Sequence, residues 1–122
     1  MAKPIHFTDI TSTSELFDKL NNYAKGKLCV VMFTASWCGP CKKIKPEIYN
    51  KGDEKELAIK YKKDVAFFYI DIDENPELTK EFNVASVPMF QFIVCKGKDI
   101  EFVGKISGGN KNKLVETIDN YL

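Results

Sequence analysis

Residues 28–41 read LCVVMFTASWCGPC, and this stretch decides the expected fold and chemistry. Its first six residues are a continuous apolar run, too short for an amphipathic helix, which indicates a strand buried on both faces of a sheet. Two cysteines follow, Cys38 and Cys41, separated by Gly39 and Pro40. Because the first turn of a helix has no intrahelical N–H bonds to lose, it tolerates such a proline. The stretch therefore predicts a buried strand that turns directly into a helix.

The C-x-x-C spacing at a helix start favours thiol–disulfide chemistry. Residues i and i+3 lie on one helix face with Cβ atoms about 5–6 Å apart, so a modest adjustment closes a disulfide. The free N–H groups and positive dipole end of the helix stabilise a thiolate, the reacting form of cysteine, at Cys38, and Lys42 and Lys43 add positive charge. We therefore expect Cys38 to be the exposed nucleophile, and Cys41, one turn further in, to be the resolving cysteine of a redox Cys38–Cys41 disulfide.

The alternatives for the cysteines are a metal site and a structural disulfide. Zinc and iron–sulfur sites normally need four ligands, and the only histidine is His6. Cys29 and Cys95 lie in predicted apolar strands, where free cysteines behave as small hydrophobes, with a regulatory disulfide or modification as their alternative. No metal is therefore expected. A purely structural disulfide is also disfavoured, because a four-residue loop removes little chain entropy.

Strand and helix patterns alternate along the rest of the chain. Strands are expected at 4–10, 28–33, 65–70, 88–95 and 100–106, the last two joined by a hairpin turn at 96–99. Helices are expected over 12–26, from 38 to about 49, over about 54–63, from 75 to about 82, and over 110–122. The order β α β α β α β β α predicts a mixed central sheet with helices on both faces.

Caps and breaks mark the ends of the expected helices. Pro46 is expected to kink or interrupt its helix, because its ring crowds the preceding turn, and residues 50–53 to break the chain. Four residues are expected to cap helices: Ser12 (with Glu15 in a capping box), Asp53 (with Glu56), Asn75 (followed by Pro76) and Asn110. The last helix is expected to turn Leu114, Val115, Ile118 and Leu122 inward.

Composition limits the function classes. The chain has 122 residues and a mass of 13.9 kDa, with 44% hydrophobic and 29% charged residues, typical of one soluble globular domain spanning 1–122. A net charge of +1 offers no basic excess for nucleic acid. The clearest apolar runs, 28–33 and 65–70, are far shorter than the ~20 residues of a membrane helix, and no secretory signal is visible. A cytoplasmic protein without nucleic-acid or membrane partners is expected.

These features together resemble the thioredoxin family over essentially the whole chain. The resemblance rests on the strand 28–33, WCGPC, the following lysine, Pro46, the DIDENP segment, Val87-Pro88 and Gly108. It implies the α/β thioredoxin fold, with a central mixed sheet of about five strands flanked by four helices. It also implies reduction of disulfides in target proteins by a monomer without a cofactor of its own, recharged by a flavin-containing thioredoxin reductase that draws on NADPH.

The resemblance also supplies substrate-binding residues. It implies a cis peptide bond between Val87 and Pro88, which would expose backbone polar groups of Val87 for pairing with an extended substrate segment. The implied apolar rim around Cys38 consists of Trp37, Gly39, Pro40, Val87, Pro88 and Gly108. Because the net charge is small, we expect target proteins to be recognised through this rim and through backbone pairing instead of through a strong electrostatic field.

Several positions depart from the family pattern. Met32 replaces a buried aspartate that many thioredoxins carry six residues before the first cysteine, where it assists proton transfer, and Tyr69 replaces a lysine found in some members. The two changes are mutually consistent, because loss of the acid removes the charge that a buried lysine would pair with. They indicate either a repacked core or altered proton handling at Cys41. Met89 replaces a common threonine, so partner preference is also expected to shift.

Other functions and features stay open at this stage. The alternatives are a thioredoxin-fold binding subunit or partner adaptor with secondary redox activity, and an oxidase or isomerase. The intact WCGPC weighs against the first, and Gly-Pro between the cysteines resembles the reducing members of the family. The segments 50–56 and 96–106 are longer than usual, and surface variation without function is the default interpretation.

Overall fold

Five strands form one mixed sheet in the computed structural model, which describes residues 7–22, 24–96 and 99–122. The strands are β1 (Phe7–Asp9), β2 (Leu28–Thr34), β3 (Val65–Asp71), β4 (Met89–Lys96) and β5 (Asp99–Ser107), in the spatial order β1-β3-β2-β4-β5. β1 and β2 run parallel to β3, whereas β4 is antiparallel to both β2 and β5. The expected mixed sheet is confirmed; residues 4–6 of the expected first strand lie outside the described residues.

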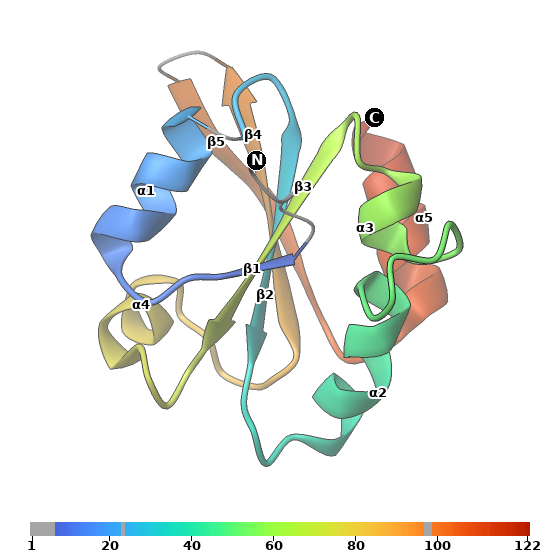
Figure 1. Ribbon diagram of the computed structural model, residues 1–122. Coiled ribbons are helices and arrows are strands. Elements are labelled where there is room, and N and C mark those ends of the chain that lie inside the picture. Colours follow the sequence, from blue (N-terminus) through green and yellow to red (C-terminus); the bar gives the residue numbers. More distant parts are fainter. Residues whose placement is uncertain (1–6, 23, 97–98) are drawn as a thin grey trace.

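Helices cover both faces of this sheet (Figure 1). They are α1 (Thr13–Asn22), α2 (Gly39–Ile48), α3 (Leu57–Lys60), α4 (Pro76–Glu81) and α5 (Lys111–Tyr121). α1 and α4 cover one face, and α2, α3 and α5 cover the other. β2 is buried along its whole length because its side chains alternate between the two cores. Met32 thus faces α2, and its neighbour Phe33 faces α1 and α4.

Two separate helices lie between β2 and β3, in agreement with the two helical pieces expected there, so the described residues contain five helices where the family resemblance implied four. α2 ends at Ile48, Tyr49 is extended (φ −157°, ψ 130°), and α3 is a separate helix of four residues. The helix expected over about 54–63 is therefore much shorter. Pro46 lies inside α2, which continues two residues beyond it, so proline does not interrupt the helix.

The carboxylate of Glu56 explains this break. It accepts hydrogen bonds from the backbone N–H groups of Asn50, Lys51 and Gly52 at 2.7, 3.0 and 3.0 Å. Desolvation alone would raise the pKa of Glu56, but these backbone donors outweigh it and hold the pKa below its usual value. Because Glu56 itself occupies the N-cap position of α3, the expected cap at Asp53 is wrong. The longer segment 50–56 is an ordered loop organised by one side chain.

Two of the predicted caps are confirmed. The Ser12 hydroxyl accepts from the backbone N–H of Glu15 at 3.0 Å, and the Glu15 carboxylate accepts from the N–H of Thr11 at 2.7 Å. The Asn110 side chain accepts from the N–H of Lys113 at 3.1 Å. These bonds satisfy N–H groups that the first turns of α1 and α5 cannot satisfy internally.

Two helix details are wrong. Asn75 occupies the N-cap position of α4 without a side-chain cap bond, because its amide donates instead to the carbonyls of Ile10 and Asp71. Leu122 was expected to point inward but is 55% exposed, because α5 ends one residue before it.

The hairpin between β4 and β5 pairs from Lys96 opposite Asp99 to Met89 opposite Ser107. Residues 97 and 98 of the predicted turn lie outside the described residues. An irregularity after Phe92 leaves one extra residue in β5. Among the residues that the structure describes, no helix is both long and apolar enough to cross a membrane.

Candidate redox-active site

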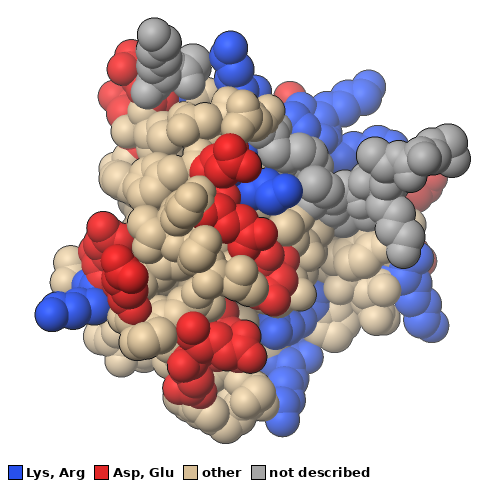
Figure 2. Space-filling model, turned by 60° about the vertical axis from the view of Figure 1, so that its left-hand side comes forward, with Lys and Arg blue, Asp and Glu red and all other residues tan. Residues whose placement is uncertain are grey.

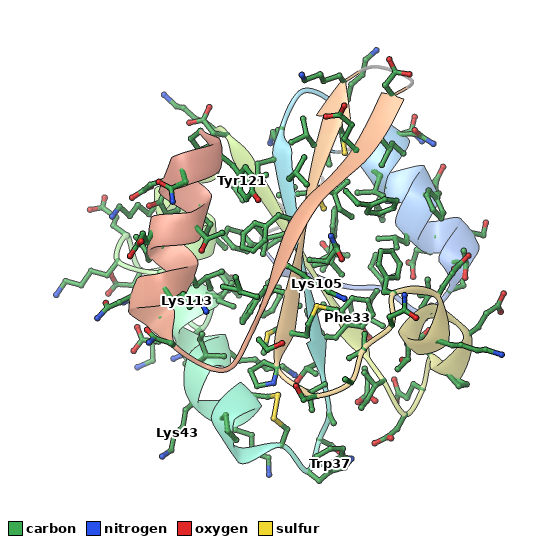
Figure 3. The ribbon with its side chains drawn as sticks, turned by 180° about the vertical axis from the view of Figure 1, so that it is seen from behind. Phe33, Trp37, Lys43, Lys105, Lys113 and Tyr121 are labelled. Atoms are coloured by element: carbon green, nitrogen blue, oxygen red, sulfur yellow. A yellow bond between two sulfur atoms is a disulfide. The ribbon has the colours of Figure 1, made fainter. Side chains whose placement is uncertain are left out.

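The predicted cysteine pair lies at the edge of the sheet where β2 and β3 end and β4 begins. Phe33 of β2 is opposite Met89, the first residue of β4, and Thr34 is opposite Asp71, the last residue of β3. The loops that leave β2 and β3 and the loop that enters β4 therefore meet at one place. The β2–α2 loop and the first turn of α2 carry the disulfide there (Figure 3).

Cys38 and Cys41 form a disulfide with a Cα–Cα distance of 5.3 Å. Cys38 has extended backbone angles (φ −83°, ψ 111°) and occupies the N-cap position of α2, where its Sγ accepts a hydrogen bond from the Cys41 N–H at 3.2 Å. A helix N–H group and the positive end of the helix dipole thus face this sulfur. After reduction, the same arrangement favours a thiolate at Cys38.

The two cysteines differ only slightly in exposure. Cys41 is completely buried, as expected, but Cys38 is only 3% exposed, whereas we expected an exposed nucleophile. The reason is that its Sγ is turned toward Cys41, to which it is bonded. The neighbouring Trp37 is 65% exposed, and Gly39 and Pro40 are also exposed.

The structure brings the expected rim residues together from three loops. The Val87–Pro88 peptide bond is cis, as the family resemblance implied. The carbonyl of Pro88 accepts a hydrogen bond from the N–H of Gly108 at 2.9 Å, and Gly108 has a φ of +99°, a conformation that favours glycine. The β5–α5 loop is thereby tied to the start of β4, beside the disulfide.

Gly109 is a site residue that sequence reasoning missed. A Cβ atom added there would lie 3.2 Å from the carbonyl oxygen and 3.3 Å from the Cβ of Pro40, so a side chain at this position would press on the first turn of α2, whereas glycine leaves room for the close approach of the β5–α5 loop. The one sequence signal was its neighbour Gly108, which the family resemblance places in the rim.

Asp73 is a second residue that was missed. Its Oδ2 accepts a hydrogen bond from the indole Nε1 of Trp37 at 2.8 Å, which holds the exposed ring beside the disulfide. Asp71 orders this loop, because its carboxylate accepts from the backbone N–H groups of Asp73 and Glu74 at 2.8 and 3.3 Å. The available signal was the acidic stretch from Asp71 to Glu74 at the end of the buried strand.

The two departures from the family pattern are direct neighbours. Met32 and Tyr69 are opposite each other on β2 and β3. Met32 is 1% exposed and belongs to the core cluster that holds both cysteines, whereas the Tyr69 ring packs on Phe7 and lies 5.0 Å from the Lys45 ammonium. Desolvation, followed by the charge of Asp9, raises the pKa of Tyr69. Lys45 thus takes part in a cation–π contact at the edge of this core.

Cys29 and Cys95 are fully buried in the other core, beneath α1 and α4. Burial raises the pKa of both thiols, and for Cys29 the proximity of Cys95 adds to the shift. Their predicted place in apolar strands is confirmed. Across the described ranges, no group of three or more histidine, cysteine, aspartate and glutamate side chains could hold a metal ion.

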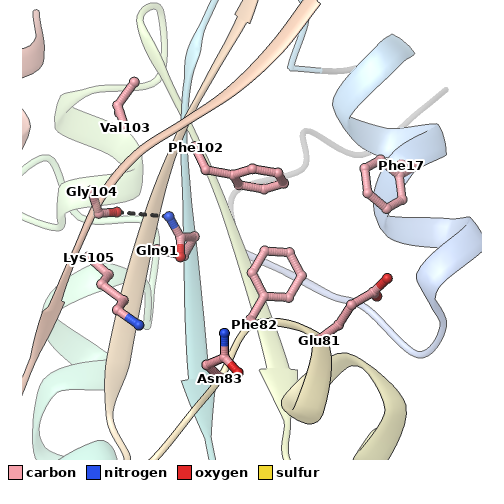
Figure 4. Close-up of a pocket in the computed structure, with 9 residues that line it drawn as sticks. All are labelled: Phe17, Glu81, Phe82, Asn83, Gln91, Phe102, Val103, Gly104 and Lys105. Atoms are coloured by element: carbon pink, nitrogen blue, oxygen red, sulfur yellow. Dashed lines mark hydrogen bonds between the residues drawn. The ribbon is translucent and has the colours of Figure 1, made fainter.

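A separate hollow of about 450 Å³ lies on the α1/α4 face of the sheet, away from the disulfide (Figure 4). Phe17, Phe82 and Phe102 supply its apolar wall, and Glu81 and Lys105 supply charged groups. None of the predicted site residues lines it. We therefore place the redox chemistry at the cysteine pair, not at this hollow.

Comparisons with known proteins agree with this geometry. The family model described as Thioredoxin matches residues 8–120. Thioredoxin from Pongo abelii is 41% identical over 103 residues, which cover 84% of this chain and 88% of that protein. Thioredoxin H2 from Arabidopsis thaliana is 42% identical over 92 residues, which cover 75% of this chain but only 61% of the plant protein. The X-ray structure of Fasciola hepatica thioredoxin superimposes with a TM-score of 0.78 at 35% identity, covering 94% of this chain and 99% of that one.

Proposed function

Because this chain belongs to the thioredoxin family, we propose that it reduces protein disulfides through Cys38 as nucleophile and Cys41 as resolving cysteine. The match to the thioredoxin family model and the thioredoxin relatives at about 40% identity support this function. The observation that supports the assignment of roles is the position of Cys38 at the N-cap of α2, with the Cys41 N–H directed at its sulfur. The chain acts as a single domain over residues 1–122.

The reaction consists of two exchanges. The Cys38 thiolate attacks one sulfur of the target disulfide; a Cys38–target bond forms, the target S–S bond breaks, and one target sulfur leaves as a thiolate. Cys41 then loses its proton and attacks the Cys38 sulfur, which releases the second target thiolate and leaves the Cys38–Cys41 disulfide seen here. The target gains two electrons and, on protonation, two protons. The chain is oxidised by the same two electrons.

The rim residues hold the substrate during these exchanges. Trp37, Gly39, Pro40, Val87, Pro88 and Gly108 provide the surface around the cysteines. Backbone polar groups of Val87, the residue before the cis bond to Pro88, pair with an extended target segment as an added strand. Gly109 supports this surface, because it lets its loop approach Pro40.

Recycling requires a second protein. The family implies re-reduction by a reductase, and we propose an NADPH-dependent, flavin-containing thioredoxin reductase that passes two electrons to the Cys38–Cys41 disulfide. We also propose that the chain works as a monomer in the cytoplasm.

The decisive experiment follows NADPH oxidation in the presence of thioredoxin reductase and a protein disulfide such as that of insulin. Wild type is expected to turn over, Cys38→Ser to be inactive, and Cys41→Ser to accumulate a mixed disulfide detectable by mass. Cys29→Ser is the matched control and is expected to retain turnover. No turnover by wild type, together with retained capture of a partner by Cys38→Ser, would instead favour the adaptor function.

A further inference from the structure

The charged residues are distributed unevenly, so that one side of the molecule is basic and the other is acidic although the net charge is close to zero. Residues 39–63, which include α2 and α3, carry eight lysines and four carboxylates. On the other side of the molecule, α1 and residues 71–81 together carry seven carboxylates and two lysines. Figure 2 shows these carboxylates gathered over the α1/α4 side. We expected targets to be recognised without a strong electrostatic field. The separation of charge near the site corrects this expectation.

The boundary between the two sides passes through the disulfide. Asp73 is fixed beside Trp37 by the 2.8 Å hydrogen bond, and the exposed Glu74 follows it. Lys42 and Lys43 are exposed in the first turn of α2, directly after Cys41. In Figure 3 the disulfide lies between Trp37 and Lys43. A segment that reaches Cys38 therefore has acidic groups on one side and lysines on the other.

These charges are free to meet a partner. The one ion pair found within the described residues joins Lys111 and Glu47, so neither Lys42 nor Lys43 has an ionic partner there, and the same holds for Glu74. The indole that donates to Asp73 is a neutral group and adds no opposite charge there. Complementary charges around an interface orient the partner, and like charges in the reversed orientation repel it.

We propose that this site selects bipolar disulfide segments: the cystine of the target is flanked by Lys or Arg on the side that meets Asp73 and Glu74, and by Asp or Glu on the side that meets Lys42 and Lys43. This inference rests on the proposed function and adds a substrate class to it. The charges act on the encounter and on orientation, whereas the electrons still pass through Cys38 and Cys41.

Three synthetic peptides test the proposal, each with one cysteine held as a mixed disulfide with the same neutral thiol. The first has two lysines before and two glutamates after the cysteine, the second has the reverse order, and the third has glutamine at all four positions. We expect kcat/KM for the two charged peptides to differ by about five-fold at low salt, with the neutral peptide between them. At 0.5 M salt the difference is expected to disappear, because screening shortens the reach of exposed charges.

Variants on the basic and on the acidic side of the disulfide test which residues cause the preference for one charged peptide over the other. Lys42→Gln with Lys43→Gln, and separately Glu74→Gln, are each expected to reduce the ratio between the charged peptides; using the ratio cancels any change in the reactivity of Cys38. Lys62→Gln with Lys63→Gln is the matched control, since these exposed lysines lie beside the start of β3, at the opposite end of the sheet. This control is expected to leave the ratio unchanged.

The outcomes separate the two proposals. Equal rates for both charged peptides, or a ratio that the Lys62/Lys63 control lowers as much as the flank variants do, would overturn bipolar selection while leaving disulfide reduction intact. If wild type reduces the neutral peptide no faster than Cys38→Ser does, the proposed function fails, and the selection that rests on it fails as well.

Discussion

Replacing Met32 by aspartate tests how this chain handles the proton of its resolving cysteine. Met32 is 1% exposed, lies in the core cluster of Cys38 and Cys41, and has Tyr69 and Phe90 opposite it on the adjacent strands. A carboxyl group placed there would lose its water and gain two aromatic neighbours. Full burial raises a carboxyl pKa by about 3–5 units, which moves an ordinary value near 3.9 to roughly 7–9.

The raised pKa of the buried carboxyl group also determines how much the substitution lowers the free energy of unfolding. Because the folded-state pKa would lie above the unfolded value, the protein with Met32→Asp is most stable below about pH 4 and loses stability until the pH passes the folded-state pKa. Each unit of pH over that range corresponds to about 1.4 kcal/mol. At pH 7, Met32→Asp should therefore lose about 4 kcal/mol more of its free energy of unfolding than Met32→Asn, which has a similar size but does not titrate.

The assay is the single-turnover rate of reduction of a protein disulfide between pH 5.5 and 9, at pH values where urea unfolding shows each protein to be folded. Met32→Asp should gain a titration step at roughly pH 7–9 and, above it, resolve about ten-fold faster than Met32→Asn, because the ionised carboxyl can accept the proton of Cys41. If wild type and both variants have superimposable rate profiles, position 32 has no part in proton handling, and Met32 is only a repacked core residue.

Three further predictions concern stability and the spare cysteines. Glu56→Gln should lower the free energy of unfolding at pH 7. Because the pKa of Glu56 is lowered in the folded state, protonation removes its contribution to stability, so the difference from wild type should shrink as the pH falls below 4.5. A pH-independent difference in urea unfolding would contradict this. Tyr61→Phe loses the 2.7 Å bond to Asp119 and should cost about 1 kcal/mol of the free energy of unfolding at pH 7. Because burial, followed by the bond to and the charge of Asp119, raises the pKa of Tyr61 to about 12, urea unfolding should show the full wild-type advantage below pH 10 and its loss as the pH rises toward 12. Under mild peroxide, mass analysis should find Cys29 and Cys95 unmodified, because burial raises their pKa and removes the reactive thiolate; oxidation of either in the folded protein would support a regulatory role.

Local signals in the sequence predicted most of the elements correctly. The run 28–33 and the motif at Cys38 describe a buried strand and a helix start, and both depend on neighbours within a few residues. The caps at Ser12 and Asn110 are local for the same reason. Predictions were wrong where a side chain had a choice of partners. Glu56 binds backbone N–H groups before α3 instead of extending the helix, and Asn75 donates to the carbonyls of Ile10 and Asp71 instead of capping α4.

By itself, the sequence determined the buried strand, the cysteine spacing and the family, because each is a pattern of adjacent residues. Only the tertiary structure decided what surrounds the disulfide. Trp37 donates a hydrogen bond to Asp73, which is 36 residues away in the sequence. Gly109, which follows the edge strand β5, lies against Pro40. These contacts exist because parallel crossovers bring the ends of β2 and β3 to one edge, where the loop after β5 also arrives. The same packing places most lysines of α2 and α3 on one side of the molecule and the carboxylates of α1 and residues 71–81 on the other, and the boundary between these sides passes Cys38.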